Sequence, residues 1–539
     1  MEPRKLVHEG TGDGRILALG VDLLHNILSR LPAVSFSRAA ATCRTFRKIC
    51  TRVLNRPKLL SALSLNTLLQ DAVEEAFEKV LSEPIRPHFV IACIGRKFNL
   101  SKAHKLIQAR LGDGIPVVTC LARGIIGKEV ITGEFVEVQW DPDDSRENGK
   151  AYNSSRNIYR GILLIVGFVP GLKVDAVPLK RAKKRSERGA LVESFLSEIK
   201  SFTSSASGST SPLGILLFSD NDSDMRYVVG KMDEALGRDT IIAGDERGCF
   251  LFSGGEGFTN AGGSEHNHED FDAVGLVFAT DRGKSHDIGE IHFNLLLSSG
   301  ISPVGPTYKA ASVRVSDDSM TCFTWLTATR EGSLERLDGQ RIIADLENEQ
   351  MANGDGADVY IGVLKRRKCS ATSRRKSFCS AFAFHAVNGG DEEYLFVEGD
   401  GIRTGDRFRC YVPNVETALL SRDTVFEELK HLKTSGAQST GDASGPQNAN
   451  RMEQVFGGLM FTCYGRGESF YGKQNVDSSV FLENFPNTPM AGVFCAGEIG
   501  CGPSTKPEDC LESNPGNIFL HVYSAVYVLM SYSPKEVDY

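Results

Sequence analysis

The chain has 539 residues, of which 41% are hydrophobic and 24% are charged, and its formal net charge is −7. These values are typical of a folded protein with a sizeable core and several domains. The mild acidity gives no reason to expect nucleic acid or an anionic membrane as a partner. The 13 cysteines are scattered and no signal-peptide pattern precedes them, which indicates reduced thiols in the cytoplasm or the nucleus.

Residues 1–15 are polar and are predicted to form a flexible tail, after which the pattern becomes helical. Apolar residues recur every three or four positions from Leu19 to Leu31, so one face of a first helix is apolar. Asp22 stands where an N-cap is expected, and Pro32 disfavours helical backbone at the residue before it. A second helix carries six apolar positions at helical spacing: Phe36, Ala39, Ala40, Cys43, Phe46 and Ile49.

A third helix is predicted over residues 63–81, and from residue 89 onward short β-branched runs alternate with helical ones. The predicted strands cover residues 89–94, 116–120, 162–168, 214–218, 273–279, 360–364, 378–385, 394–397 and 518–532. The predicted helices in this part cover residues 101–111, with Ser101 as the cap, 189–202 and 223–236. Three polar or glycine-rich stretches, 201–211, 254–270 and 434–450, are predicted to be loops.

This order of elements predicts an α+β protein, with a small N-terminal helical module and a two-lobed mixed α/β body whose β-sheets are flanked by helices. The expected divisions are a tail at 1–15, the module at 16–60, a helical linker at 61–86, a first lobe at 87–345 and a second lobe at 346–539, with a disordered loop at 434–450. The longest apolar stretch, 518–532, is too short and too interrupted to span a bilayer, so no membrane association is expected.

The helical module carries a recognisable motif. Residues 23–32 read Leu-Leu-His-Asn-Ile-Leu-Ser-Arg-Leu-Pro, and residues 38–47 read Arg-Ala-Ala-Ala-Thr-Cys-Arg-Thr-Phe-Arg. This resembles the F-box, in which a leucine-rich helix ends in Leu-Pro and a second helix carries a Cys-Arg-x-aromatic signature. Two positions depart from that pattern, because Gly20-Val21 replaces the usual proline and Phe46 replaces the usual tryptophan. The alternative interpretation is a helical hairpin that caps the next domain.

The F-box resemblance implies a partner and a role. It implies that the module binds a Skp1-type adaptor, and through it a cullin/RING ubiquitin ligase, while the rest of the chain holds a protein substrate of unknown identity. A module of about 40 residues is near the lower limit for an independent core, so part of its apolar surface should be covered by a partner. The residues expected to form or support this interface are Leu23, Leu24, Ile27, Leu28, Leu31, Pro32, Phe36, Cys43 and Phe46.

A second motif lies near the C-terminal end of the chain. Residues 461–467 read Phe-Thr-Cys-Tyr-Gly-Arg-Gly, and residues 493–500 read Val-Phe-Cys-Ala-Gly-Glu-Ile-Gly. Both are apolar strands that run into tight turns, whose glycines permit positive φ and close backbone approach. We expect the turns to hold Arg466 and Glu498 near one another at the mouth of a pocket. The alternative is an ion pair that is only structural.

This second motif resembles the C-terminal part of the FIST domain, and residues 87–345, with Gly-Ile-Ile-Gly at 124–127, resemble its N-terminal part. The order F-box, FIST-N, FIST-C is that of F-box proteins with a FIST body, which implies the capture of a protein substrate. FIST domains of bacterial signalling proteins imply an alternative, the sensing of a small, amino-acid-like ligand. The candidate pocket residues are Cys463, Arg466, Glu498 and His521.

Other chemistry is weakly supported. Cys463 and His521 resemble a nucleophile and base, but no third orienting residue is evident, so the chain is expected to be a non-catalytic receptor. Cys495, Cys501, Cys510 and His521 lack the paired spacing of a zinc site, and the His266–His268 pair lies in a glycine-rich stretch, so no metal or other cofactor is expected. The basic runs at 180–188 and 365–376 are solvated loops or nuclear-import patches, and without interleaved aromatic residues they do not predict nucleic-acid binding.

Overall fold

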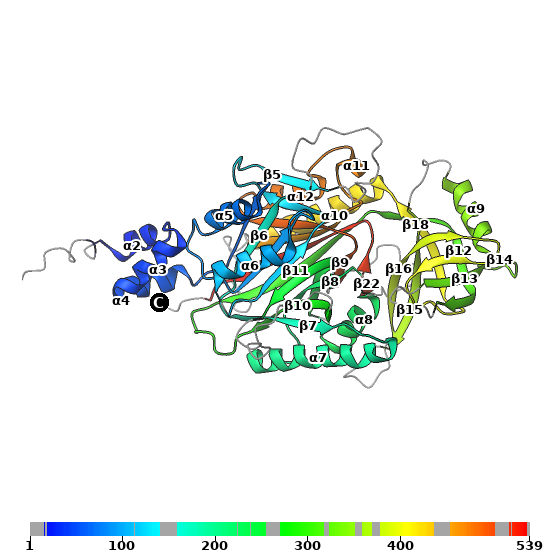
Figure 1. Ribbon diagram of the computed structural model, residues 1–539, viewed down its shortest axis with the longest axis horizontal. Helices are drawn as coiled ribbons and strands as arrows, with labels where there is room; N and C mark the ends of the chain where they lie inside the picture. The colour runs from blue at the N-terminus through cyan, green and yellow to red at the C-terminus, as the bar shows by residue number, and fades with distance from the viewer. Residues whose placement is uncertain are drawn as a thin grey trace, which may run out of the picture.

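A computed structural model describes residues 16, 19–112, 114–140, 159–221, 223, 225–237, 239–254, 270–316, 323–350, 358–368, 378–435, 453–501, 517–518 and 520–535. The predicted tail at 1–15 and most of the predicted loops at 254–270 and 434–450 lie outside these ranges. Three parts follow one another along the longest axis: a small helical module, a large layered body, and a β-barrel at the opposite end (Figure 1). The predicted α+β class is confirmed.

The helical module consists of α2 (Val21–Leu28), α3 (Ala33–Thr42) and α4 (Arg44–Val53). The predicted second helix is therefore two helices, because Cys43 is extended at φ −152° and ψ 165° and its Sγ accepts the backbone N–H of Phe46 at 3.4 Å. Gly20, not Asp22, precedes α2, and Asp22 lies in the first turn, where a carboxylate suits the helix dipole. The shared core of the three helices consists of Leu24, Leu28, Phe36, Ile49, Cys50 and Val53.

The stretch expected to be a helical linker contains an edge strand of the body. β1 (Lys58–Ser64) pairs antiparallel with β6 (Ile162–Phe168) along its whole length, and α5 (Leu69–Val80) follows it. Alternate residues of β1 face opposite sides, with Leu59 and Leu63 in the core between the sheets and Ala62 beneath α5. The predicted helix over 63–81 was therefore wrong at its start, because the pairing with β6 outweighs local helical spacing.

The larger of the two body sheets is ten-stranded in the described residues. Its main path is β1, β6, β2 (Phe89–Ile94), β3 (Val117–Leu121), β9 (Ile241–Ser253), β8 (Gly214–Asp220), β10 (Phe271–Thr280) and β7 (Leu172–Lys180). A branch adds β21 (Glu498–Cys501) beside β9 and β23 (Leu520–His521) beside β21. Two predicted strands, 89–94 and 162–168, have the predicted bounds, and those predicted at 116–120, 214–218 and 273–279 differ by no more than two residues at either end.

The second body sheet contains β11 (Glu290–Ser299), β24 (Ser524–Ser533), β19 (Gln454–Cys463), β20 (Met490–Cys495), β4 (Gly124–Lys128) and β5 (Phe135–Gln139). The two sheets pack face to face, and the rings of Phe218 and Phe461 meet edge-on between them at 6.2 Å. The predicted strand over 518–532 is divided, because Tyr523, at φ 48°, turns the chain between β23 and β24.

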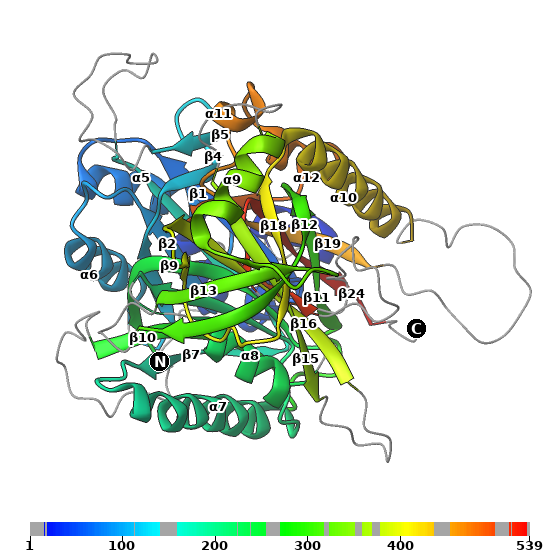
Figure 2. The same cartoon turned by 90° about the vertical axis from the view of Figure 1, so that its right-hand side faces the viewer.

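Helices cover both outer faces of this pair of sheets, giving four layers (Figures 1 and 2). Helices α5, α6 (Leu100–Leu111), α7 (Arg185–Ser207) and α8 (Met225–Ala235) cover the ten-stranded sheet, and α10 (Val415–Ser435) and α12 (Val476–Asn484) cover the other. Asn99, not Ser101, caps α6. The predicted loop at 201–211 is wrong up to Ser207, because α7 continues with Ile199 and Thr203 buried against the sheet.

The third sheet closes into a barrel, whose strands face the viewer in Figure 2. The ring consists of β12 (Ile301–Val315), β18 (Arg407–Pro413), β15 (Tyr360–Lys368), β16 (Phe378–Gly390), β17 (Leu395–Glu398) and β13 (Phe323–Arg330), which pairs with β12 again. β14 (Arg336–Leu337) and β22 (Asn517–Ile518) pair at its margins, and α9 (Gly339–Gln350) packs into its core. Strands on either side of the expected lobe boundary at 345 thus share sheets. No helix in the described ranges has the length and apolar character needed to cross a membrane.

Candidate functional site

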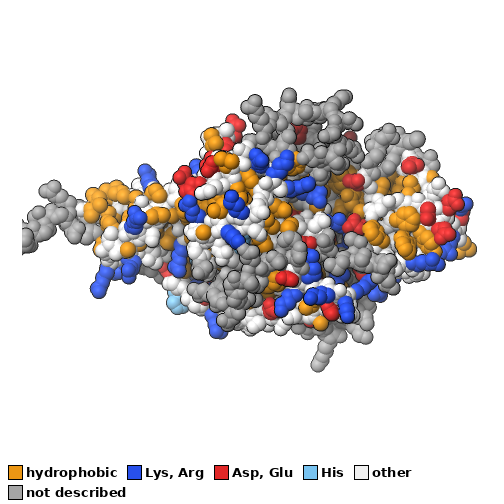
Figure 3. Space-filling view, viewed as in Figure 1, with side chains coloured by type: hydrophobic (Ala, Val, Ile, Leu, Met, Phe, Trp, Pro, Cys, Tyr) orange, Lys and Arg blue, Asp and Glu red, His pale blue; other side chains and the backbone are white. Residues whose placement is uncertain are grey.

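The first candidate site is the outward face of the helical module. Leu23 and Ile27 on α2 are 49% and 41% exposed, and Val34 on α3 is 54% exposed. Figure 3 shows hydrophobic side chains gathered at this end of the molecule. Helix α2 is therefore apolar on two sides, because Leu24 and Leu28 turn inward into the module's own core. We call Leu23, Ile27 and Val34 the module's apolar face.

The nine residues expected at an adaptor interface divide into three groups by burial. Leu24, Leu28 and Phe36 are buried, and Leu31, Cys43 and Phe46 are half-buried. Leu23, Ile27 and Pro32 are exposed. The exposed group can touch a partner directly, while the buried group can only hold the helices in position.

The module touches the body through a small set of contacts. The Ala33 N–H donates to the Leu81 carbonyl at 2.9 Å, and the Asn55 amide donates to Asp287 Oδ2 at 3.0 Å. Ala33 also reaches the core beneath α5. These contacts fix the module to one end of the body and leave its apolar face exposed. A hairpin that served only to cap the body would have no use for an exposed apolar face.

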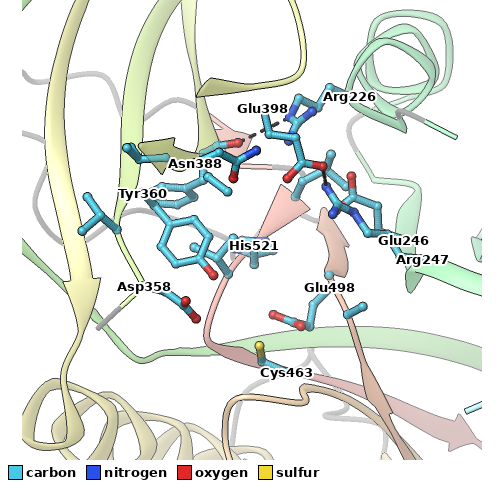
Figure 4. Close-up of a pocket in the computed structure, with 18 residues that line it drawn as sticks. Arg226, Glu246, Arg247, Asp358, Tyr360, Asn388, Glu398, Cys463, Glu498 and His521 are labelled. Atoms are coloured by element: carbon cyan, nitrogen blue, oxygen red, sulfur yellow. Dashed lines mark hydrogen bonds and ion pairs between the residues drawn. The ribbon is translucent and has the colours of Figure 1, made fainter. Parts of the chain in front are cut away.

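The second candidate site is a cavity of about 260 Å³ between the body and the barrel (Figure 4). Three groups of elements supply its polar lining. Helix α8 and strand β9 supply Arg226, Glu246 and Arg247; the barrel strands and the residues beside them supply Asp358, Tyr360, Asn388 and Glu398; the ends of β19, β21 and β23 supply Cys463, Glu498 and His521. Three of the four predicted pocket residues are thus brought together, and Arg466 is not among those that line the cavity.

Glu498 is the most deeply buried carboxyl of this lining. Its side chain has no exposed surface, and Ser524 donates to Oε2 through its hydroxyl at 2.8 Å and its backbone N–H at 3.2 Å. Oε1 has no hydrogen-bond partner among the described residues. Burial raises the pKa of Glu498 to about 8, because transfer out of water disfavours the charged form. The carboxyl is therefore largely protonated at neutral pH.

Cys463 and His521 lack the properties of a nucleophile and its base. Burial, and then the neighbouring charge of Glu498, raise the pKa of the Cys463 thiol well above its usual value. Burial lowers the pKa of His521 to about 4, and its Nε2 lies 2.8 Å from the Gly500 carbonyl. A protonated thiol and a neutral imidazole whose N–H is already engaged do not form an activated pair.

Arg466 is near enough to Glu498 for its charge to act on that carboxyl, as predicted, but it does not line the cavity and its ion-pair partner is another residue. Its guanidinium is fully buried and makes a two-fold contact with Asp477, Nε to Oδ2 at 2.9 Å and Nη2 to Oδ1 at 2.7 Å. It also donates to the Ser298 carbonyl and hydroxyl and to the Tyr523 carbonyl. Burial alone would lower the pKa of Arg466, but the charge of Asp477 raises it. The alternative expectation, a structural ion pair, describes this residue, although its partner is on α12.

The glycines of the two motifs are required for space rather than for positive φ. Gly465, Gly467, Gly497 and Gly500 do not have φ in the left-handed region. A Cβ on Gly497 would lie 2.4 Å from Glu246 Oε2, and a Cβ on Gly465 would lie 2.5 Å from the Tyr523 ring. The turns therefore let neighbouring side chains pack directly on the backbone at the edge of the cavity.

Sequence reasoning missed the residues supplied by β9 and the barrel. One signal was available in β9, where Asp245, Glu246 and Arg247 follow an apolar run, so that charges enter a buried strand. Asp245 is itself buried, and burial raises its pKa to about 7. No comparable signal marks Asp358 or Glu398, because only the closure of the barrel brings them to the cavity.

The candidate metal ligands and the two basic runs lie only partly within the described residues. Within the described residues, no three His, Cys, Asp or Glu side chains come together as metal ligands would. Cys510, His266 and His268 lie outside those residues, as do the side chains of the basic run at 365–376. Three arginines of the run at 180–188 have partners: Arg181 pairs with Asp220 at 2.9 Å, Arg185 pairs with Asp400 at 2.6 Å, and Arg188, in the first turn of α7, has its guanidinium over the Tyr227 ring.

Comparison with known proteins agrees with both motifs. Residues 16–58 match the F-box domain, and residues 357–501 match the FIST C domain, which includes Cys463 and Glu498. An F-box/LRR-repeat protein of Arabidopsis thaliana is 39% identical over 524 residues, which cover 96% of this chain and 94% of that protein. The chain belongs to the F-box protein family.

Two further relatives match this F-box protein over short stretches. The human F-box only protein 22 is 36% identical over 87 residues, or 15% of this chain and 21% of that protein. An uncharacterized protein of Mycobacterium tuberculosis is 48% identical over 44 residues, or 8% of this chain and 12% of that protein. The resemblance of residues 87–345 to a FIST N domain remains a prediction.

Proposed function

We propose that this F-box protein is the substrate-recognition subunit of an SCF-type (Skp1–cullin–F-box) E3 ubiquitin ligase. The module's apolar face binds the Skp1-type adaptor, and the body and barrel bind a protein substrate. The chain then acts by proximity, because holding a substrate beside the ligase raises its effective concentration without chemistry by this chain. This role places its work in the cytoplasm or the nucleus.

The observation that carries the proposal is the double apolar character of α2. Leu24 and Leu28 are buried in the module, and Leu23 and Ile27 are exposed on the other side of the same helix. Burying a leucine or isoleucine side chain contributes about 1.5–3 kcal/mol, and an apolar face rimmed by polar residues is typical of a protein-binding surface. The F-box match over residues 16–58 supports a Skp1-type adaptor as the partner of this surface.

The test is co-purification of the full chain with a Skp1-type adaptor. Leu23→Asp and Ile27→Asp each place a charge on the module's apolar face and should abolish co-purification while the thermal unfolding transition is kept. Leu420→Asp on α10 is the matched control, because Leu420 is 71% exposed and belongs to the body. Adaptor binding that survives Leu23→Asp, or that Leu420→Asp abolishes equally, would contradict the proposal.

A second candidate function, small-ligand sensing, is favoured by one specific observation. The cavity between body and barrel contains a buried carboxyl oxygen, Glu498 Oε1, with no hydrogen-bond partner among the described residues. Buried polar atoms are rarely left without partners, so the cavity is suited to a ligand that supplies a polar partner for this oxygen. The two functions separate in the Leu23→Asp variant, which should lose the adaptor and still bind a ligand.

A further inference from the structure

The cavity between body and barrel is lined by more carboxyl groups than guanidinium groups. Four carboxyl groups line it, from Glu246, Asp358, Glu398 and Glu498, against two guanidinium groups, from Arg226 and Arg247. Arg247 is paired with Glu398, and Asp358 Oδ2 accepts the Tyr523 hydroxyl at 2.9 Å. Even with Glu498 protonated, carboxylates exceed guanidinium groups, so the lining attracts a cation and repels an anion.

The unpartnered oxygen of Glu498 is a specific atom to which a bound cation can donate a hydrogen bond. Figure 4 shows the Glu498 carboxyl beside Cys463, with Asp358 and Tyr360 on the other side of the cavity. Ser524 holds Oε2 through two hydrogen bonds, which leaves Oε1 to accept one from a molecule in the cavity. The Cys463 thiol also lies against this carboxyl, but a thiol is a weak donor.

The shape and the apolar part of the lining restrict the cation further. The Tyr360 and Phe384 rings line the same cavity as Glu498, and aromatic faces attract organic cations. A volume of about 260 Å³ is near the lower end for ligand sites, so the cavity fits one side-chain-sized group rather than a folded peptide segment. An ammonium on a short alkyl chain satisfies both the carboxyl and the apolar surfaces.

We infer that this cavity binds a primary ammonium group, presented either by a free alkylamine or by a lysine side chain of a protein substrate. The ammonium donates to Glu498 Oε1, with Asp358 on the opposite side, and its alkyl chain contacts Tyr360 and Phe384. This assignment rests on the second candidate function, since it names the chemical class that the cavity takes.

Binding of an ammonium should depend on pH, because a protonated carboxyl must ionise to pair with it. Glu498, with its pKa near 8, releases a proton when the cation binds at neutral pH. The titratable groups near it are Cys463, Cys495, Tyr360, Tyr523 and the guanidinium of Arg466, together with its strand partners Asp245 on β9 and His521 on β23. Burial raises the pKa of each of these thiols and phenols, so none of them ionises ahead of Glu498. Asp245, whose pKa burial raises to about 7, ionises first, and His521, whose pKa burial lowers to about 4, stays neutral. The affinity should therefore fall about tenfold per pH unit below pH 8.

The experiment uses the full chain and four probes in isothermal titration calorimetry. n-Butylamine presents a free ammonium, and N-acetyl-lysine N-methylamide presents the lysine side chain on a capped backbone. Butyrate and the Nε-acetylated capped lysine are the anionic and neutral controls. We expect at least one of the two amines to bind and neither control to do so. Because binding releases a proton to the buffer, the measured binding enthalpy should vary with the buffer's ionisation enthalpy.

Two variants complete the test. Glu498→Gln keeps an oxygen for Ser524 and turns an N–H toward the cavity, and Asp358→Asn removes the opposite charge; each should weaken amine binding, the first by about 10- to 100-fold. Binding by the free amine alone selects small amines, and binding by the capped lysine selects protein side chains. Controls that bind as well as the amines, failure of both amines to bind, or unchanged affinity in both variants would overturn the inference. Binding of butyrate alone would leave ligand sensing standing and reject the ammonium.

Discussion

Glu498 and Asp245 are direct partners in the antiparallel pairing of β21 with β9, and both carboxyls are buried. Burial raises the pKa of Glu498 to about 8 and that of Asp245 to about 7. The edge of the large sheet nearest the cavity thus carries two acids that resist ionisation at neutral pH. This pair gives the protein a pH dependence opposite to that of ordinary salt-bridged carboxylates.

The free energy of unfolding should lose a contribution as the pH rises from about 4.5 to 8, because the folded state holds protons on Glu498 and Asp245 that the unfolded state has lost. Each such proton contributes a slope of about −1.4 kcal/mol per pH unit. Above pH 7 the slope comes mainly from Glu498, so Glu498→Gln should flatten it there, while Asp245→Asn should act at lower pH. Urea unfolding at several pH values measures both. An unchanged slope in Glu498→Gln would contradict the assignment.

The Arg466–Asp477 pair should be a major determinant of stability. Removing one partner of a buried ion pair leaves an uncompensated charge and destabilises by about 3–5 kcal/mol, so Arg466→Ala and Asp477→Ala should each do so. Arg466→Met combined with Asp477→Leu should destabilise by less than the sum of the single changes. Lys430→Ala is the control, since its pair with Glu427 is exposed on α10 and contributes little. Chemical unfolding gives all four values.

Gly497→Ala should disturb the cavity without unfolding the protein. The new Cβ would lie 2.4 Å from Glu246 Oε2, so the Glu246 side chain must move. We expect a loss of stability of about 1–3 kcal/mol and weaker binding of any ligand that occupies the cavity. Gly472→Ala tests the opposite case, because its φ of 70° is strained for alanine although the space around it is open. Equal ligand affinity in Gly497→Ala and the unmodified chain would show that Glu246 does not shape the site.

Adjacent leucines on α2 should respond in opposite ways. Leu24→Ala removes a buried side chain and should lower the stability of the module by about 2–5 kcal/mol. Leu23→Ala removes an exposed one and should change stability by less than about 0.5 kcal/mol, yet it should weaken adaptor binding. Hydrogen exchange of the module's amides measures the first effect and co-purification the second. A stability loss in Leu23→Ala as large as that in Leu24→Ala would place Leu23 in the core.

The local pattern of apolar residues predicted those helices and strands whose burial in the fold matches that pattern. The strands at 89–94 and 162–168 are apolar along their whole length because both faces are buried, one against the other sheet and one against α5 and α6. Pattern failed at Lys58–Ser64, whose partner strand lies about a hundred residues further on. It also failed at Ser201–Ser207, where a serine-rich segment is helical because residues before it are held on the sheet.

The candidate site residues were likewise predictable where a local motif marks them, and not where long-range packing brings them together. Cys463 and Glu498 were identified from local motifs and His521 as a possible base for Cys463, and all three line one cavity. The partner of Arg466 was not identified, because Asp477 comes from a helix outside the glycine-rich motif and lacks a signal of its own. Asp358 and Glu398 reach the cavity only through the closure of the barrel, which depends on long-range pairing.

Strand β24, residues Ser524–Ser533, lies between β11 and β19 and is buried along its whole length. Before β24 is synthesised, no strand pairs with β11 and β19 in its place, and each of them has an unpaired backbone edge that other chains can reach. A nascent or truncated chain that lacks β24 can therefore complete neither the second sheet nor the turn that holds Arg466. Such chains are expected to be chaperone clients and aggregation-prone rather than partly functional receptors.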